Sequence, residues 1–258
     1  MDIHSVVDKR RKLARTCRLL HAALGRGVTG DRTFLLDEEE TFAAASIRPL
    51  TMPVVIEKET WFIVATAVGS IRRLAKPGSR RRRRQNEEEK RLGRRLDRSR
   101  RCVRAVMGRL SRVAPSGRIT LRTDEKASYA SIARAVLGER VEHQTTPGTL
   151  VRAAHNPLFA INTTMAMSRE NCACLRRRSW SVSKRPKGLR DQLALFTSYR
   201  NYVRRRFNRD GPQETPAKLL QLAPRALTPA ELLAWRQDWG DRSIHPISLD
   251  GQRTVGRP

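Results

Sequence analysis

The stretch from Arg118 to Tyr129 is the feature that most constrains the fold of this 258-residue chain. Ile119 and Leu121 alternate with polar residues, a pattern typical of a short half-buried strand, and the strand stops on Asp124 before a Ser- and Ala-rich helix. Open α/β sheets bind their ligands outside the carboxyl ends of the strands. The pattern therefore predicts an α/β fold with Asp124 at the ligand-binding end of a central strand.

A second acid occupies a similar place. The apolar run at 34–36 also ends on a carboxylate, Asp37, which lies 87 residues before Asp124. Two strands that each end in a carboxylate can lie side by side and direct both acids into one crevice, and two carboxylates a few ångströms apart form a site for a hard divalent cation. We therefore predict a metal site at this pair. The alternatives are a solvated acidic loop over 37–40 and a helix N-cap region at Asp124.

The net charge narrows the choice of partner. The chain carries 53 Lys and Arg against 25 Asp and Glu, a formal charge of +28, while 39% of its residues are hydrophobic. A chain with this apolar content can bury a core, and so strong a positive charge favours nucleic acid as the partner over an anionic membrane. The sequence has no uncharged apolar stretch long enough to span a membrane and no signal-peptide layout, which predicts a cytoplasmic, nucleoid-associated protein.

The order of the predicted elements gives the fold class. The patterns predict strands at 33–36, 50–57 and 61–68, before Asp124, and at 140–144, with helices at 85–113, 128–137, 158–178 and 189–207. This is the element order of the ribonuclease H-like fold, a mixed five-stranded sheet flanked by helices. We expect a basic linker helix within residues 1–30, the α/β domain over 31–209, and a Pro-rich helical C-terminal extension over 210–258, with one helix at 229–239 and a loose tail.

The long helix expected at 85–113 carries an apolar stripe at steps of three, four and seven residues. We expect its members to be buried, namely Leu92, Leu96, Val103, Val106, Leu110 and Val113. The arginine run at 80–84 precedes the helix in an expected basic loop at 76–84.

Five motifs follow one another along the chain. They are Asp37-Glu-x-x-Thr-Phe42, Leu50-Thr-x-Pro-Val-Val, Thr123-Asp124-x-x-x-Ser-Tyr129, Arg176-Arg-Arg-Ser-Trp-Ser-x-Ser-Lys184 and Tyr199-Arg-Asn-Tyr202. In this order they resemble the DDE transposases of bacterial insertion sequences, in the branch near the first-described insertion-sequence family. The resemblance covers about residues 31–207. It implies a ribonuclease H-like catalytic domain in which two aspartates and a third residue hold two Mg²⁺ ions, for which Mn²⁺ can substitute.

The third ligand departs from the family's pattern. An ungapped alignment back from 176–184 puts Asn162 where many relatives carry glutamate, and Arg169 where they carry a basic residue. Seven residues are nearly two turns, so the two share one helix face, as a metal ligand and a phosphate contact should. An amide oxygen can bind Mg²⁺. Glu170 is the alternative: it is a true carboxylate on the same helix, about 80° round from Asn162, so only one of the two is expected to enter the site.

Basic residues are expected to hold the DNA backbone. An aromatic ring among guanidinium groups can stack on a frayed base, which singles out Trp180 beside Arg176, Arg177 and Arg178, with core packing as the alternative for the ring. Such groups provide affinity and salt dependence without base specificity. The remaining residues predicted to contact DNA are Lys126, Arg169, Lys184 and, within the arginine run, Arg82 and Arg83.

The function that the resemblance implies is a transposase that catalyses Mg²⁺-dependent DNA strand cleavage and strand transfer at insertion-sequence ends. Its partners would be double-stranded transposon ends and target DNA, on which it would act as a homodimer or larger assembly. Relatives carry an N-terminal zinc ribbon or helix-turn-helix that reads these ends, and none fits in residues 1–30, so the start is truncated or recognition belongs to another chain. The alternative is a catalytically inactive DNA-binding relic or a regulator of transposition.

Overall fold

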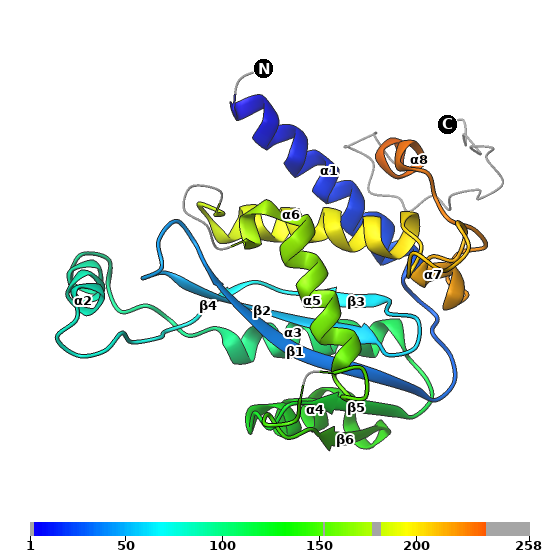
Figure 1. The fold of residues 1–258 in the computed structure, drawn as a ribbon, viewed down its shortest axis with the longest axis horizontal. Coiled ribbons are helices and arrows are strands. Elements are labelled where there is room, and N and C mark those ends of the chain that lie inside the picture. Colours follow the sequence, from blue (N-terminus) through cyan, green and yellow to red (C-terminus); the bar gives the residue numbers. More distant parts are fainter. Residues whose placement is uncertain (1–2, 152, 177–181, 236–258) are drawn as a thin grey trace.

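The computed structural model describes residues 3–151, 153–176 and 182–235. Its centre is a mixed six-stranded sheet in the order β3-β2-β1-β5-β6, with the two-residue strand β4 (Gly69–Ser70) beside β2 (Figure 1). Helices cover both faces of the sheet. The predicted α/β class with a mixed sheet flanked by helices is confirmed, and the arrangement is compatible with a ribonuclease H-like fold.

The strands divide into an antiparallel and a parallel half. β1 (Arg32–Phe42), β2 (Pro49–Glu57) and β3 (Ile63–Thr66) form an antiparallel meander. On its other side, β1 lies parallel to β5 (Ile119–Thr123), which lies parallel to β6 (Val141–Thr145). Every residue of β2 is buried, because strands flank it on both sides and helices cover both faces, which accounts for its continuous apolar run.

Two sets of helices sandwich the sheet. α1 (Ile3–Leu24), α3 (Ser99–Val113) and α4 (Ser128–Leu137) share one core with Phe34 and Leu36 of β1. Leu35 points the other way, into a second core with α5 (Phe159–Asn171) and α6 (Pro186–Ser198). Successive side chains of a strand point to opposite faces, so β1 contributes to both cores.

The remaining elements are short. Two 3₁₀ helices, η1 (Gly138–Arg140) and η2 (Ala173–Leu175), follow α4 and α5. A π-helical turn, η4 (Tyr199–Val203), continues α6, and the described C-terminal part adds α7 (Pro216–Leu219) and α8 (Pro229–Ala234). The pieces beyond η4 pack back on the first core through Ala217, Leu227 and Leu232.

Side chains rather than a further strand pair with the outer edge of β3. Asn201 is fully buried, and its amide accepts from the Ile63 N–H and donates to the Ile63 carbonyl, both at 2.9 Å. His21 Nε2 donates to the Val64 carbonyl at 2.9 Å, so its Nδ1 accepts from the Tyr202 hydroxyl at 2.9 Å. An exposed edge would offer unpaired N–H and C=O groups to another chain, and α1 and η4 cover these.

The single helix predicted over 85–113 is wrong. α2 (Arg80–Leu92) ends where Gly93 takes a positive φ of 81°, and α3 begins six residues later at Ser99. The part of the stripe on α3 is buried as predicted, but Leu92 and Leu96 are each 63% exposed. Their spacing continues the stripe, but α2 lies beyond the end of the sheet and the segment after it leads back to α3, so neither leucine packs in a core (Figure 1).

The basic loop predicted over 76–84 becomes helical at Arg80. Ser79 caps this helix: its hydroxyl accepts from the backbone N–H of Arg82 at 3.2 Å. The helices predicted over 158–178 and 189–207 are also shorter than predicted, because α5 ends at Asn171 and the regular turns of α6 end at Ser198. In the part of the chain that the structure describes, no helix is both long and apolar enough to cross a bilayer.

Candidate active site

Asp37 lies in β1, and Asp124 directly follows the neighbouring parallel strand β5. The pairing of β1 with β5 joins residues 87 apart along its whole length, from Arg32 with Ile119 to Leu35 with Arg122. Continued by two residues, this register places Asp124, which directly follows β5, beside Asp37. Neighbouring strands lie about 4.8 Å apart, and paired residues of parallel strands point to the same face. The two predicted ligands therefore have corresponding positions on neighbouring strands, with Asp124 one residue beyond the end of β5.

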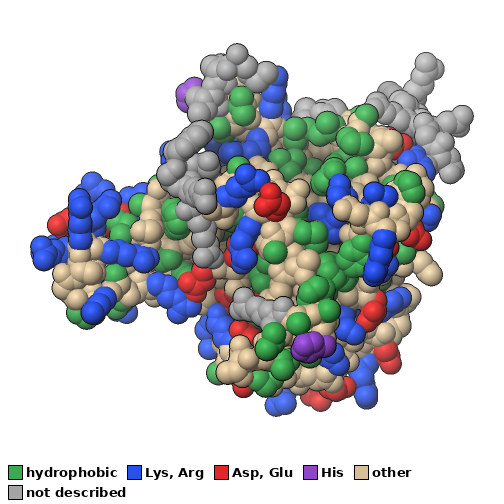
Figure 2. Space-filling view, viewed as in Figure 1, with side chains coloured by type: hydrophobic (Ala, Val, Ile, Leu, Met, Phe, Trp, Pro, Cys, Tyr) green, Lys and Arg blue, Asp and Glu red, His purple; other side chains and the backbone are tan. Residues whose placement is uncertain are grey.

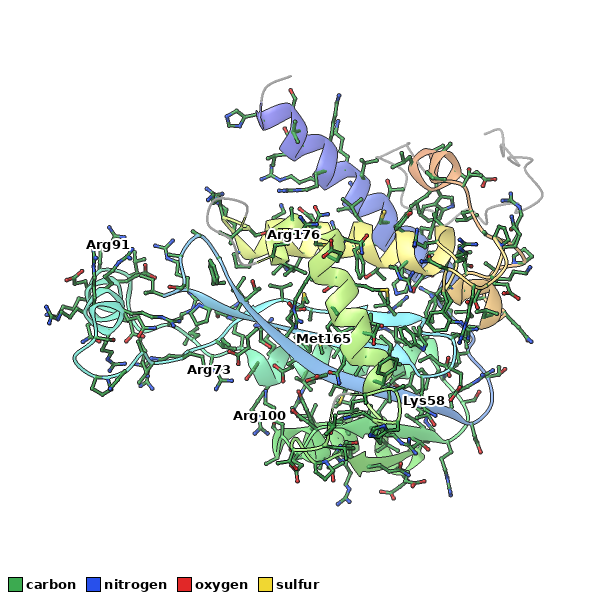
Figure 3. The ribbon with its side chains drawn as sticks, in the orientation of Figure 1. Lys58, Arg73, Arg91, Arg100, Met165 and Arg176 are labelled. Atoms are coloured by element: carbon green, nitrogen blue, oxygen red, sulfur yellow. The ribbon has the colours of Figure 1, made fainter. Side chains whose placement is uncertain are left out.

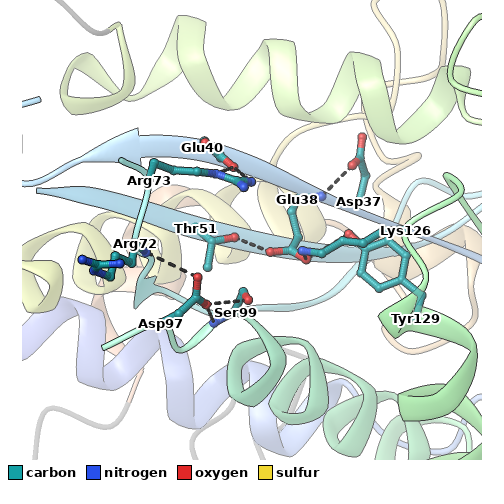
Figure 4. Close-up of polar contacts among 10 residues, drawn as sticks. All are labelled: Asp37, Glu38, Glu40, Thr51, Arg72, Arg73, Asp97, Ser99, Lys126 and Tyr129. Carbon is teal, nitrogen blue, oxygen red and sulfur yellow. Dashed lines mark hydrogen bonds and ion pairs between the residues drawn. The ribbon is translucent and has the colours of Figure 1, made fainter. Parts of the chain in front are cut away.

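The prediction that the strand ends at Asp37 is wrong. β1 continues to Phe42, which pairs with Pro49 of β2. Asp37 lies on the same face as Leu35, which packs in the core with α5, whereas Glu38 points to the opposite face (Figure 4). The neighbouring glutamates look like a loop in the sequence, but each has a cationic partner in the fold, which allows the strand to continue through them.

Asp124 lies in a turn that its neighbours hold in place. Its Oδ1 accepts from the backbone N–H of Lys126 at 3.1 Å. The Thr123 hydroxyl donates to the Asp124 carbonyl oxygen at 2.6 Å and, having one proton, accepts from His143 Nε2 at 2.9 Å. Burial lowers the pKa of His143, so the ring is neutral at pH 7 and carries its proton on Nε2. This network orients the carboxylate at the end of β5.

Glu38 forms a buried hydrogen-bonded cluster beneath the two aspartates. Its side chain is 8% exposed, and its Oε1 accepts from Lys126 Nζ at 2.5 Å and from the Tyr129 hydroxyl at 3.0 Å, while Oε2 accepts from the Thr51 hydroxyl at 2.5 Å. The sequence signals only that Glu38 points away from Asp37, and nothing in it identifies these partners.

The phenol of Tyr129 lies near three acids. Burial raises the pKa of its phenol, and the negative charges of Glu38, Asp124 and Asp37, in that order, raise it further. The phenol therefore stays protonated and serves as a donor to Glu38. Because Tyr129 is 1% exposed, it is a part of the core rather than a phosphate contact. Lys126, predicted to bind DNA, has its ammonium held by Glu38 and 36% of its side chain exposed.

Glu39 ties α5 to β1 on the face of Asp37. Its side chain is fully buried and accepts from Arg169 Nε at 2.7 Å and from the Ser168 hydroxyl at 3.3 Å. Arg169 was predicted to contact phosphate; its side chain is 43% exposed, with its Nε on Glu39. A buried carboxylate costs several kcal/mol unless it is paired, so this contact fixes where the C-terminal half of α5 crosses the sheet.

The two candidates for the third ligand face different ways. Asn162 is partly buried and shares the helix strip of Arg169, about 10 Å nearer the N-terminus of α5. Glu170 is 80% exposed and pairs with Arg176 Nη2 at 3.1 Å, near the end of α5 that leads to η2 (Figure 3). The strip that contacts β1 therefore carries the amide rather than the carboxylate.

The other basic residues predicted to bind DNA lie in several places. Arg177, Arg178 and Trp180 fall outside the described residues. Arg176 pairs with Glu170, and Lys184 is exposed before α6. Arg82 and Arg83 lie on α2, away from the aspartate pair (Figure 1).

The donor set is compatible with Mg²⁺ but incomplete in carboxylates. Among the described residues, no group of three or more His, Cys, Asp or Glu side chains is arranged to hold a metal ion. Mg²⁺ often binds through one or two carboxylates, with water and substrate phosphate completing its shell. Asp37 and Asp124 would be the two carboxylates of such a site, and Asn162 would supply the amide.

No protein-family model matches the sequence, and no curated protein matches it. Among solved structures, the chain is similar to one chain of the simian T-cell lymphotropic virus intasome in complex with the PP2A regulatory subunit B56 gamma. The TM-score is 0.37 and the sequence identity 12%, over 76% of this chain and 56% of that chain. A similarity of this size assigns no family.

Proposed function

We propose that the protein is a DNA transposase of the DDE type, in which Asp37 and Asp124 hold two Mg²⁺ ions and the third ligand is the amide of Asn162. The observation that supports the proposal is the constant offset of 87 residues in the pairing of β1 with β5, which is also the offset between Asp37 and Asp124. The sheet supports it further: an antiparallel meander followed by two parallel strands beside β1 is the order expected of a ribonuclease H-like catalytic domain.

The chain's residues would bind and orient the reacting groups. Bound Mg²⁺ would activate an attacking water or DNA 3′-hydroxyl and stabilise the leaving oxygen of an in-line displacement at phosphorus. Glu38 and Lys126 brace the Asp124 turn from below, and Glu39 holds α5 over the face of Asp37. The net charge of +28 favours a polyanionic substrate, so we assign double-stranded DNA ends and target, bound by two or more copies.

A second candidate is an inactive DNA-binding relative. It is favoured by the absence of a third acidic ligand among the described residues and by the outward direction of Glu170. The same fold and basic surface would then bind DNA without cutting it.

The test is Mg²⁺-dependent nicking and strand transfer on a labelled duplex that carries the inverted repeats flanking the gene. We expect 3′-hydroxyl products from the wild type and a loss of at least a thousandfold in rate for Asp124→Asn, whereas the matched exposed control Glu139→Gln keeps its rate. Asn162→Ala should then lose activity and Glu170→Ala should keep it. Folded wild-type protein that binds DNA but yields no product with Mg²⁺ or Mn²⁺ would establish the inactive relative instead.

A further inference from the structure

Residues 71–98, between β4 and α3, form a projection that we name the arginine arm. It contains thirteen Lys and Arg and four Asp and Glu, a net charge of +9 within 28 residues. The arm carries α2 out beyond the end of the sheet, where basic side chains gather on its surface (Figures 1 and 2). About a third of the protein's net charge is therefore concentrated on one protrusion.

The arm is braced internally. The Arg72 guanidinium donates to both carboxylate oxygens of Glu89, at 2.9 and 3.0 Å. Gln85 is buried, accepts from the Ala75 N–H at 2.9 Å and donates to the Arg73 carbonyl at 2.8 Å. These contacts hold α2 against the strand-like segment that leads into it, so the arm is a folded element rather than a loop.

Further contacts fix the arm to the sheet. The Arg48 Nε, in the β1–β2 connection, lies 2.9 Å from both carboxylate oxygens of Glu88, and Arg81 donates to the Ser46 carbonyl at 2.7 Å. Arg95, from the returning segment, donates to the Pro49 carbonyl at 2.8 Å. The orientation of α2 relative to β1 and β2 is therefore set by charge-assisted bonds from one side of the helix.

These contacts divide the charged side chains of α2 into an inner set, which binds the rest of the protein, and an outer set. On the inner side, Glu88, Glu89, Gln85 and Arg81 form the hydrogen bonds described above. At 100° per residue, the opposite arc of about 120° carries Arg80, Arg83, Arg84, Lys90 and Arg91, with Glu87 as its one acid. These five cations are exposed and make no hydrogen bond or ion pair with the described residues. Figure 3 shows Arg91 at the far end of the molecule from Lys58.

The outer row fits a phosphate backbone. Five cations spread over the rise from residue 80 to 91, about 17 Å, on a straight rod. Duplex DNA presents one negative charge for about every 1.7 Å of its axis. The arm has no Phe, Trp, Tyr or His, so it offers no ring on which an unpaired base could stack. We infer that the arginine arm is a docking surface for the phosphates of double-stranded DNA.

The base of the arm contacts the strand that carries Asp37. Arg73, at its base, binds Glu40 of β1, with its Nε 3.0 Å from Oε1 (Figure 4). Glu40 is three residues from Asp37, about 10 Å along the strand. The inference rests on the proposed DNA substrate but does not require that the protein cleave it.

Binding measured in EDTA tests the arm separately from catalysis. The arm variant is R80A/R83A/R84A/R91A, and the control variant R15A/R104A/R112A/R134A removes the same charge from exposed positions on α1, α3 and α4. Fluorescence anisotropy of a labelled 30-base-pair duplex is followed from 50 to 300 mM KCl. For the arm variant we expect affinity at least tenfold weaker at 150 mM and a salt slope smaller by about 2 to 4. The control variant should stay within threefold of the wild type.

Each outcome bears on a different statement. If the wild type binds the duplex and the arm variant matches the control variant, the arm is not the docking surface, while the proposed function stands. Single-stranded DNA and RNA probes are measured in the same way. If the arm variant loses affinity for these probes but not for the duplex, the assignment to a duplex is wrong. If the wild type binds no duplex at any salt, both the inference and the proposed function fail. Because the substituted side chains are exposed, thermal unfolding should verify that both variants remain folded.

Discussion

Replacing Glu38 by alanine should cost the fold about 3 kcal/mol. The change leaves the Lys126 ammonium without its partner and the hydroxyls of Tyr129 and Thr51 without their acceptor. Removing one partner of a buried ion pair costs about 3–5 kcal/mol, and the exposure of Lys126 argues for the lower end. We expect the midpoint of thermal unfolding to fall by about 6–12 °C and the free energy of unfolding in urea to fall by the same 3 kcal/mol.

Two further variants separate charge from shape in this cluster. Glu38→Gln keeps an acceptor for Tyr129 and loses only the charge that faces Lys126, so it should cost about half as much. The exposed control Glu139→Gln should change stability by less than about 0.5 kcal/mol. In a double-mutant cycle, Glu38→Ala and Lys126→Met should couple by at least about 1 kcal/mol. A loss below about 1 kcal/mol for Glu38→Ala, or strict additivity in the cycle, would refute the reasoning.

Two predictions concern the covered edge of β3. Burial lowers the pKa of His21 to about 4, so between pH 6.5 and 4 the unfolded chain binds its proton first, and stability should fall with decreasing pH by up to about 3 kcal/mol. Urea unfolding at pH 7 and 4.5 should show a smaller decrease for His21→Gln, and an equal decrease would contradict the assignment. Asn201→Ala leaves the N–H and C=O of Ile63 buried without partners and should cost about 3 kcal/mol, against less than about 0.5 for exposed Asn86→Ala.

The sheet could be predicted because its strands carry strong local patterns. The alternation before Asp124 and the apolar run of β2 each predict a strand, and the structure has a strand at both places. The break between α2 and α3 has a weaker signal. Leu92 and Leu96 keep the phase of the stripe, and only Gly93 marks the end of α2. Periodicity indicates which residues share a helix face, but not whether a core lies opposite them.

The site could be predicted only in part, for a similar reason. The aspartate pair was predicted from two local patterns, each a strand followed by an acid. The two acids are 87 residues apart, and the paired residues of β1 and β5 have the same offset. The partners of Glu38 and Glu39 lie 88 and 130 residues away in the chain, at Lys126 and Arg169. No local pattern encodes such pairs, because they depend on which elements the sheet brings together.

The acidic residues of β1 are consecutive in the sequence but have different partners in the fold. Each of its three glutamates binds a cation from a different element: Glu38 the turn after β5, Glu39 helix α5 and Glu40 the base of the arginine arm. These three acids therefore fasten three parts of the protein to the central strand, which is reason enough for acids in so basic a chain. Asp37 has the same offset of 87 residues from Asp124 that the pairing of β1 with β5 shows. In a protein of charge +28, the proposed site at Asp37 and Asp124 would give a divalent cation two carboxylates to bind, and the cation would offset their mutual repulsion.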